Sequence, residues 1–154
     1  MMSLARRARL LLLPLLLPLL MPLIMLLPAA ALAQAAPTPG CGDFLAAWGD
    51  KPAAIEYQGC RQEFGQGRPL VARYRLDGAA AAEVERYLQR RFGIEALRFR
   101  CCGWEAPPHS WRDPRTGHNY LIGFGSEETL VSSRAQWDRI DNFHIRVERF
   151  TEDS

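Results

Sequence analysis

Residues 70–93 decide the fold of this chain, and they read LVARYRLDGAAAAEVERYLQRRFG. Apolar residues alternate with Arg73 and Arg75 over residues 70–76, and this alternation predicts a strand with one buried face. Asp77 then offers an N-cap and Gly93 a C-cap, so the sequence predicts a helix over residues 79–92. The residues that recur at helical spacing and form its apolar stripe are Ala81, Val84, Leu88 and Phe92.

Shorter patterns flank this unit on both sides. They predict helices over residues 43–49 and 133–140, strands over 53–60, 97–102, 119–125 and 143–147, and an irregular segment over 103–117. Hairpins separated by one long helix are typical of an α+β fold. We therefore expect a small antiparallel or mixed sheet of about five strands, with one long helix and two short helices packed on one face.

Composition excludes several classes of protein. The chain has 154 residues, of which 48% are hydrophobic, and its 19 basic and 17 acidic residues give a net charge of +2. These values exclude a disordered tail, a collagen-like fibre, a polytopic membrane protein and a strongly basic nucleic-acid binder. They also conceal an uneven distribution, because residues 10–42 contain no charged residue.

The first 33 residues have the pattern of a signal peptide. Three arginines within residues 6–9 precede an apolar run over residues 10–27, and Ala31-Leu32-Ala33 matches the small-x-small cleavage pattern. An uncleaved membrane anchor is the alternative, but prolines at 14, 18, 22 and 28 would break a spanning helix repeatedly. We expect cleavage after Ala33, a flexible lead-in over residues 34–40, one α+β domain over 41–154, and no permanent membrane span.

The expected mature chain has 121 residues and a nearly neutral charge. Cleavage of the signal peptide would remove three of the 19 basic residues and no acidic residue, which would leave 16 basic and 17 acidic residues. This balance gives no reason to expect nucleic-acid binding. Lipidation at Cys41 is an alternative fate, although the leucine expected three positions before a lipidated cysteine is absent.

The four cysteines are Cys41, Cys60, Cys101 and Cys102. In an exported chain an even number of cysteines favours disulfides, and four allow three pairings, one of them with a vicinal Cys101–Cys102 bond. A redox role is a second interpretation. A zinc site that adds His109 and His118 is a third, although its spacing matches no common zinc pattern. We expect no metal and no cofactor.

The segment 103–118 is the candidate binding region. It combines Trp104 and Trp111, which could form an aromatic platform, with Glu105, His109 and His118 as polar contacts. The alternative is that both tryptophans close an open end of the core.

Patterns further along the chain carry less information. Ser126 could form a triad with His109 or His118 and a carboxylate, but no nucleophile-elbow motif supports it. The glycines of residues 123–125 match no phosphate loop, and His144 falls on an outward strand position.

Several stretches resemble a known family: residues 74–78, 84–88, 97–105 with the run CCGWE, and 126–129, together with Trp137, Ile140, Phe143 and Val147. The resemblance covers nearly the whole expected mature chain. The family consists of small exported bacterial domains of unknown function. The resemblance implies a single exported domain and no particular activity, and some such proteins carry lipoprotein signals.

These observations favour a periplasmic or secreted, non-enzymatic binding module. We expect it to bind a protein or envelope partner through the segment 103–118, in the manner of an inhibitor, an immunity protein or an envelope accessory protein. The alternative is an envelope enzyme using thiol or Glu/His chemistry around Cys101, Cys102, Glu105 and His109. No residue is assigned a catalytic role.

Overall fold

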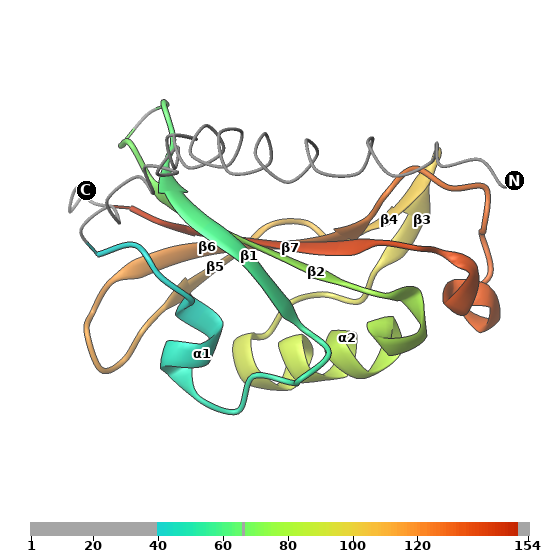
Figure 1. Ribbon diagram of the computed structural model, residues 1–154, viewed down its shortest axis with the longest axis horizontal. Helices are drawn as coiled ribbons and strands as arrows, with labels where there is room; N and C mark the ends of the chain where they lie inside the picture. Colours follow the sequence, from blue (N-terminus) through green and yellow to red (C-terminus); the bar gives the residue numbers. More distant parts are fainter. Residues whose placement is uncertain (1–39, 66, 151–154) are drawn as a thin grey trace, which may run out of the picture. The chain divides into compact units, whose positions relative to one another are not determined.

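A computed structural model describes residues 40–65 and 67–150 (Figure 1). The expected signal peptide and residues 34–39 of the expected lead-in lie outside the described residues. Contacts between residues divide the chain into units 1–35 and 36–154, and every described residue belongs to the second unit.

The domain is built on an antiparallel sheet in which the strand order is β1-β2-β7-β6-β4-β3, with β5 also paired to β6. The class α+β is therefore confirmed, but the described residues form seven strands and not about five. The strands are β1 Glu56–Gln62, β2 Leu70–Leu76, β3 Arg98–Arg100, β4 Gly103–Glu105, β5 His109–Arg112, β6 Asn119–Ser126 and β7 Phe143–Arg149.

The two additional strands, β4 and β5, lie in the segment that the sequence suggested was irregular. Each is only three or four residues long, and Pro107 and Pro108 separate them. So short a run shows no clear period of two, and its strand character comes from pairing with β6. The expected strand 97–102 is likewise reduced to β3, because a turn begins at Cys101.

Two α-helices, α1 (Phe44–Trp48) and α2 (Gly78–Phe92), lie on one side of the sheet (Figure 1). The Asp43 carboxylate caps α1 by accepting a hydrogen bond from the Ala46 backbone N–H at 3.0 Å. Gly93 ends α2 with a φ of 83°, a conformation that favours glycine. The expected helix 133–140 is instead a 3-10 segment, η2 (Arg134–Arg139), because the backbone at Gln136 is not helical.

The strand β2 shows how the sheet separates its two faces. Leu70, Ala72, Tyr74 and Leu76 are buried in the core, while Arg73 and Arg75 are exposed on the opposite face, as the alternation predicts. The stripe of α2 is also confirmed, since Ala81, Val84, Leu88 and Phe92 are all buried.

A buried carboxylate joins α2, η2 and the start of β3. Glu85 accepts hydrogen bonds from the Leu97 backbone N–H at 2.7 Å and from both terminal nitrogens of Arg134, at 2.7 and 3.0 Å. The Arg134 guanidinium also lies 5.4 and 4.6 Å from the ring centres of Trp104 and Trp137. Polar and aromatic contacts thus fix this end of the domain.

No helix among the described residues is long and apolar enough to cross a membrane.

Candidate functional site

Trp104 and Trp111 lie in different aromatic clusters, so the expected shared platform is not formed. Trp104 is only 6% exposed, and its ring packs against Phe99 and Trp137. Its indole N–H donates to the Val131 carbonyl at 2.7 Å. Trp111 is half-buried on β5 and contacts Trp48 and Phe92. These contacts match the alternative interpretation, in which both rings close the core.

The polar candidates of the same segment also separate. His109 is paired with Ile122 and therefore points to the helix-covered face, where its imidazole lies near Gly93. Glu105 is paired with Gly125 on β6 and is exposed on the open face, 3.6 Å from the Arg100 guanidinium. Of the four predicted binding residues, Glu105 alone is exposed on the open face.

A groove lies on this open face, above β6 and β7, with a volume of about 380 Å³. We call it the sheet-face groove. The residues that define it are Gly123 and Gly125 on β6, His144 and Arg146 on β7, Glu105 on β4, and Cys102 in the β3–β4 turn. Its position follows from the register, because Gly123 pairs with Arg146 and Gly125 with His144.

The two glycines of the groove floor differ in what the fold requires of them. A Cβ at Gly125 would come within 3.0 Å of the Trp104 carbonyl oxygen and 3.6 Å of His144 Nε2. At Gly123 no described atom lies within 4 Å of that position, and its φ is not in the left-handed region. Close packing thus explains Gly125, whereas the described fold has no steric need for glycine at position 123.

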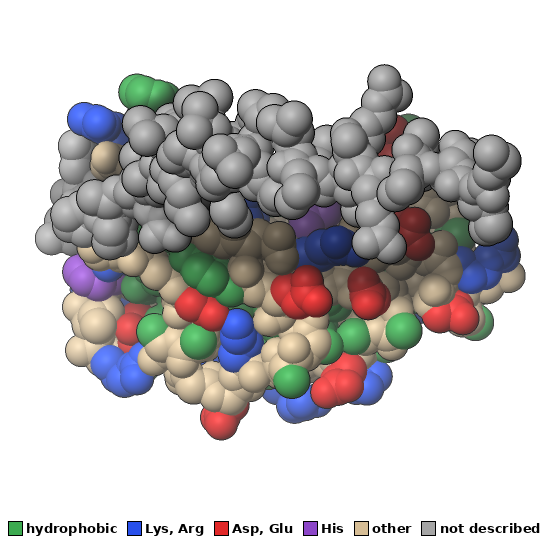
Figure 2. Space-filling model, viewed as in Figure 1, with side chains coloured by type: hydrophobic (Ala, Val, Ile, Leu, Met, Phe, Trp, Pro, Cys, Tyr) green, Lys and Arg blue, Asp and Glu red, His purple; other side chains and the backbone are tan. Residues whose placement is uncertain are grey.

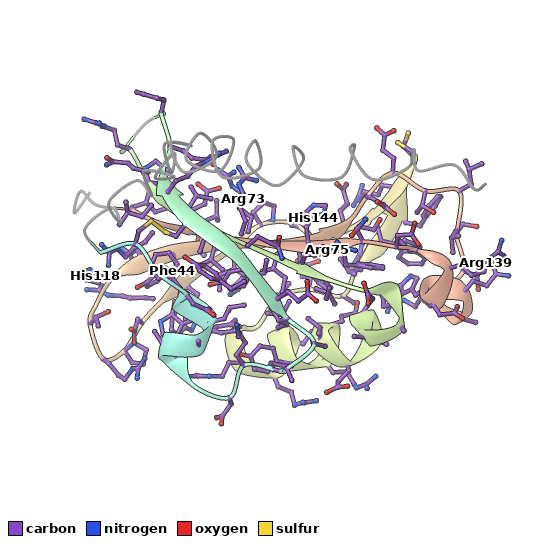
Figure 3. All side chains as sticks on the ribbon, in the orientation of Figure 1. Phe44, Arg73, Arg75, His118, Arg139 and His144 are labelled. Atoms are coloured by element: carbon purple, nitrogen blue, oxygen red, sulfur yellow. A yellow bond between two sulfur atoms is a disulfide. The ribbon has the colours of Figure 1, made fainter. Side chains whose placement is uncertain are left out.

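Basic side chains form the β7 wall of the groove. Figure 3 shows His144 with Arg73 and Arg75 on the side of the sheet away from α2. Partial desolvation and the positive charge of Arg73 lower the pKa of His144, although Glu127 opposes the shift. Arg146 is held in place by Glu148 at 2.6 Å and by Glu63 at 2.8 Å.

Glu63, just beyond the end of β1, is the anion that organises this basic wall. It accepts hydrogen bonds from Arg73 at 2.6 Å, from Arg146 at 2.8 Å and from Arg61 at 3.2 Å. The bond from Arg73, followed by those from Arg146 and Arg61, lowers the pKa of Glu63 from 4.5 to about 2, against an opposing effect of burial. Glu63 therefore remains ionised and holds the arginine side chains at fixed positions.

Acidic side chains form the opposite wall. Glu127 accepts a hydrogen bond from the Asn142 side-chain amide at 3.0 Å, and Glu128 is exposed beside it. Ser126 accepts from the Trp104 N–H and donates to the Glu127 carbonyl, so its hydroxyl is engaged in holding the backbone. Figure 2 shows acidic and basic side chains interspersed over the described part of the face in view.

The cysteines fall into two pairs. Cys41 and Cys60 form a disulfide, which joins the segment before α1 to β1, but the second disulfide expected for Cys101 and Cys102 is not formed. Cys101 and Cys102 are free, exposed thiols whose sulfur atoms are 2.9 Å apart. The hydrogen bond with Cys101, followed by partial desolvation and the negative charges of Glu128 and Glu105, raises the pKa of Cys102.

The residues suggested for a catalytic triad and for a zinc site do not come together in the described part of the chain. His118 lies beside the β5–β6 turn, whereas Ser126 lies at the far end of β6. Within the described part of the chain, no group of three or more His, Cys, Asp or Glu side chains could hold a metal ion.

A second cavity, of about 600 Å³, lies between α1 and the β5–β6 turn. Its buried Asp113 accepts hydrogen bonds from the Arg115 N–H and the Thr116 hydroxyl. Although burial alone would raise it, these bonds lower the pKa of Asp113. Arg115 in turn donates to the Ala47 carbonyl at 3.1 Å. The polar groups of this second cavity thus hold the β5–β6 turn against α1. We therefore regard the sheet-face groove as the stronger candidate site.

Sequence reasoning missed most of the groove. The exposed, outward position of His144 was predicted correctly but was given no role, and Gly123 and Gly125 were compared only with phosphate loops. The available signal was the spacing of these two glycines, which share one face of a strand whose other face carries Tyr120, Ile122 and Phe124.

Comparison with known proteins gives a match to a family model over slightly less than half of the chain and no activity. No curated protein and no solved structure matches the chain significantly. Residues 30–104 match the model of a family described as a domain of unknown function, DUF4952, and this match supports the resemblance to a family of that kind.

Proposed function

We propose that this protein is an exported, non-enzymatic binding module that holds a partner protein in the sheet-face groove. Residues 1–33 act as the signal peptide, cleavage follows Ala33, and the domain works in the periplasm or outside the cell. The basic start and apolar run of the first 33 residues support export. The disulfide between Cys41 and Cys60 is also typical of proteins in an oxidising compartment.

Gly123 is the observation that carries the proposal. Glycine in the interior of a strand weakens it and often marks a place where a ligand or another backbone approaches closely. Gly123 lies within β6, which is flanked on both sides by other strands, and a Cβ there would meet no described atom within 4 Å. We infer that the missing side chain makes room for a group from outside the domain.

The openness of the groove favours a protein partner over a small organic ligand. Small-molecule sites enclose most of the surface of their ligand. This groove is open, and it places His144 and Arg146 on one wall and Glu105 and Glu127 on the other. An extended peptide segment that carries side chains of both charges would complement these walls. A role as inhibitor, immunity protein or envelope accessory protein is compatible with such binding.

The enzymatic alternative receives weaker support. Its Glu/His form requires Glu105 and His109 to act together, but His109 points to the opposite face of the sheet from Glu105. The thiol pair retains a chemistry of its own, which does not depend on His109.

Two leucine substitutions test the proposal. Gly123→Leu fills the groove, whereas Ala82→Leu adds the same side chain at an exposed position of α2. Tagged full-length variants would be used to capture partners from a detergent-solubilised extract of the native envelope, with quantitative mass spectrometry of the bound proteins. We expect wild type and Ala82→Leu to capture the same partner, and Gly123→Leu to lose it by roughly tenfold or more. Equal capture by all three proteins would overturn the proposal.

A further inference from the structure

The turn between β3 and β4 places two neighbouring thiols on the same side of the chain. Neighbouring residues in an extended strand point to opposite faces, so adjacent cysteines in a regular strand would hold their sulfur atoms apart. Here Cys101 has a φ of 52°, in the left-handed region that non-glycine residues seldom adopt. The two sulfur atoms consequently lie 2.9 Å apart.

Backbone hydrogen bonds hold this arrangement. The Cys102 N–H donates to the Arg100 carbonyl at 2.6 Å, and the Cys102 carbonyl accepts from the Thr129 N–H at 2.7 Å. The first bond closes the turn, and the second ties it to the segment after β6. The strained conformation of Cys101 is thus maintained by its surroundings, an arrangement that is concentrated at functional sites.

We propose that Cys101 and Cys102 form a thiol–disulfide exchange site that closes reversibly to a vicinal disulfide. Both thiols are exposed, so a small disulfide can reach them. Cys41 and Cys60 are bonded to each other, and Cys101 and Cys102 are the free cysteines among the described residues. The proposal does not depend on what the groove binds.

The substrate class is a small-molecule disulfide, such as oxidised glutathione. The thiolate of one cysteine attacks a sulfur of this disulfide, forms a mixed disulfide and releases one thiolate, which takes up the proton. The neighbouring cysteine then attacks the protein-bound sulfur and releases the second thiol. In total the protein dithiol loses two electrons and two protons, and the small disulfide is reduced to two thiols.

The geometry also predicts that the bond is easily reduced again. Consecutive Cα atoms are about 3.8 Å apart across a trans peptide. This separation is shorter than the usual Cα–Cα distance of a disulfide, and such strain makes the bond more reducible. Strained, exposed disulfides are typically the labile ones, so we assign the pair to reversible exchange and not to structural stabilisation.

Oxidised glutathione tests the proposal directly. The full-length protein is first treated with reduced glutathione so that Cys101 and Cys102 are thiols, and peptide mapping verifies that Cys41 and Cys60 remain bonded. Oxidised glutathione is then added to wild type and to the matched variants Cys101→Ser and Cys102→Ser. Mass spectrometry of the intact proteins and of the peptide that contains residues 101 and 102 gives the result.

We expect the wild-type protein to form the Cys101–Cys102 disulfide. Its mass should fall by two hydrogens, neither thiol should remain free, and no glutathione should stay bound. Each single variant should instead keep one bound glutathione, because no neighbouring thiol can displace it. Wild type that retains glutathione at either position, links to a second chain, or keeps both thiols free while the variants react would overturn the proposal. Failure of all three proteins to react would overturn it as well.

Discussion

Replacing Glu85 with glutamine should destabilise the domain strongly while leaving its shape nearly unchanged. The side chains have the same size, but Glu85 is 6% exposed and accepts three hydrogen bonds, one from Leu97 N–H and two from Arg134. A glutamine amide turns an NH₂ group toward one of these donors. Because Oε1 accepts two bonds and Oε2 one, the NH₂ group replaces Oε2 and faces Arg134 Nη1, so this partly buried donor loses its acceptor and two donors face each other.

The magnitude follows from these contacts. A buried donor left without a partner costs about 1–3 kcal/mol. The Arg134 side chain is 45% exposed, so water compensates much of its lost ion pair, which adds only about 1 kcal/mol. We expect Glu85→Gln to lower the free energy of unfolding by about 2–4 kcal/mol, and the melting temperature by roughly 10 °C.

Urea denaturation followed by tryptophan fluorescence measures this change, because Trp104 and Trp137 flank Arg134. Glu83→Gln is the matched control, since it removes the same charge from an exposed position of the same helix. It should change the unfolding free energy by less than about 0.5 kcal/mol. If Glu85→Gln matched Glu83→Gln, the reasoning about this buried carboxylate would be refuted.

Three further predictions concern stability. Gly78→Ala should lower the free energy of unfolding by about 3 kcal/mol or more, because its Cβ would lie 1.8 Å from the Trp137 carbonyl oxygen. Gly42→Ala is the control: its Cβ would meet no described atom within 4 Å, so it should be nearly neutral in the same urea titration. Glu63 has a folded pKa of about 2 against an ordinary value of 4.5, so its contribution is complete above pH 4.5 and is lost as the pH falls toward 2. That shift corresponds to about 3 kcal/mol, which the exposure of its arginine partners reduces to about 1–2 kcal/mol. Glu63→Gln should therefore be less stable than wild type near neutral pH, and a gap that did not narrow at low pH would contradict this assignment. Replacing both Cys41 and Cys60 with serine opens a link across a sequence separation of 19 and should cost about 3 kcal/mol, measured as a lower urea midpoint.

The sequence predicted the elements whose patterns repeat often enough to be recognised. The strand Leu70–Leu76 has its predicted bounds, and α2 begins only one residue before the expected position. Each spans several periods of its pattern, and its burial follows from that pattern. The strands β4 and β5 could not be found in this way, because they are defined by pairing with β6 and not by their own residues.

The candidate site was harder to predict for a related reason. Tryptophan is equally suited to a core and to a binding surface, and only the contacts of Trp104 with Val131 and Trp137 decide between them. The groove combines residues from β4, β6, β7 and the β3–β4 turn, and the sequence separates these elements by up to about 40 residues. Their meeting depends on the strand order, which the local patterns did not determine.

Partner capture by Gly123→Val tests the central claim most directly. Valine favours strands and its Cβ would meet no described atom within 4 Å at this position, so the variant should be as stable as wild type, or more stable by up to about 1 kcal/mol. With stability preserved, we predict that the partner captured by wild type is lost. Undiminished capture by the stable variant would contradict the claim that the space above Gly123 belongs to a partner.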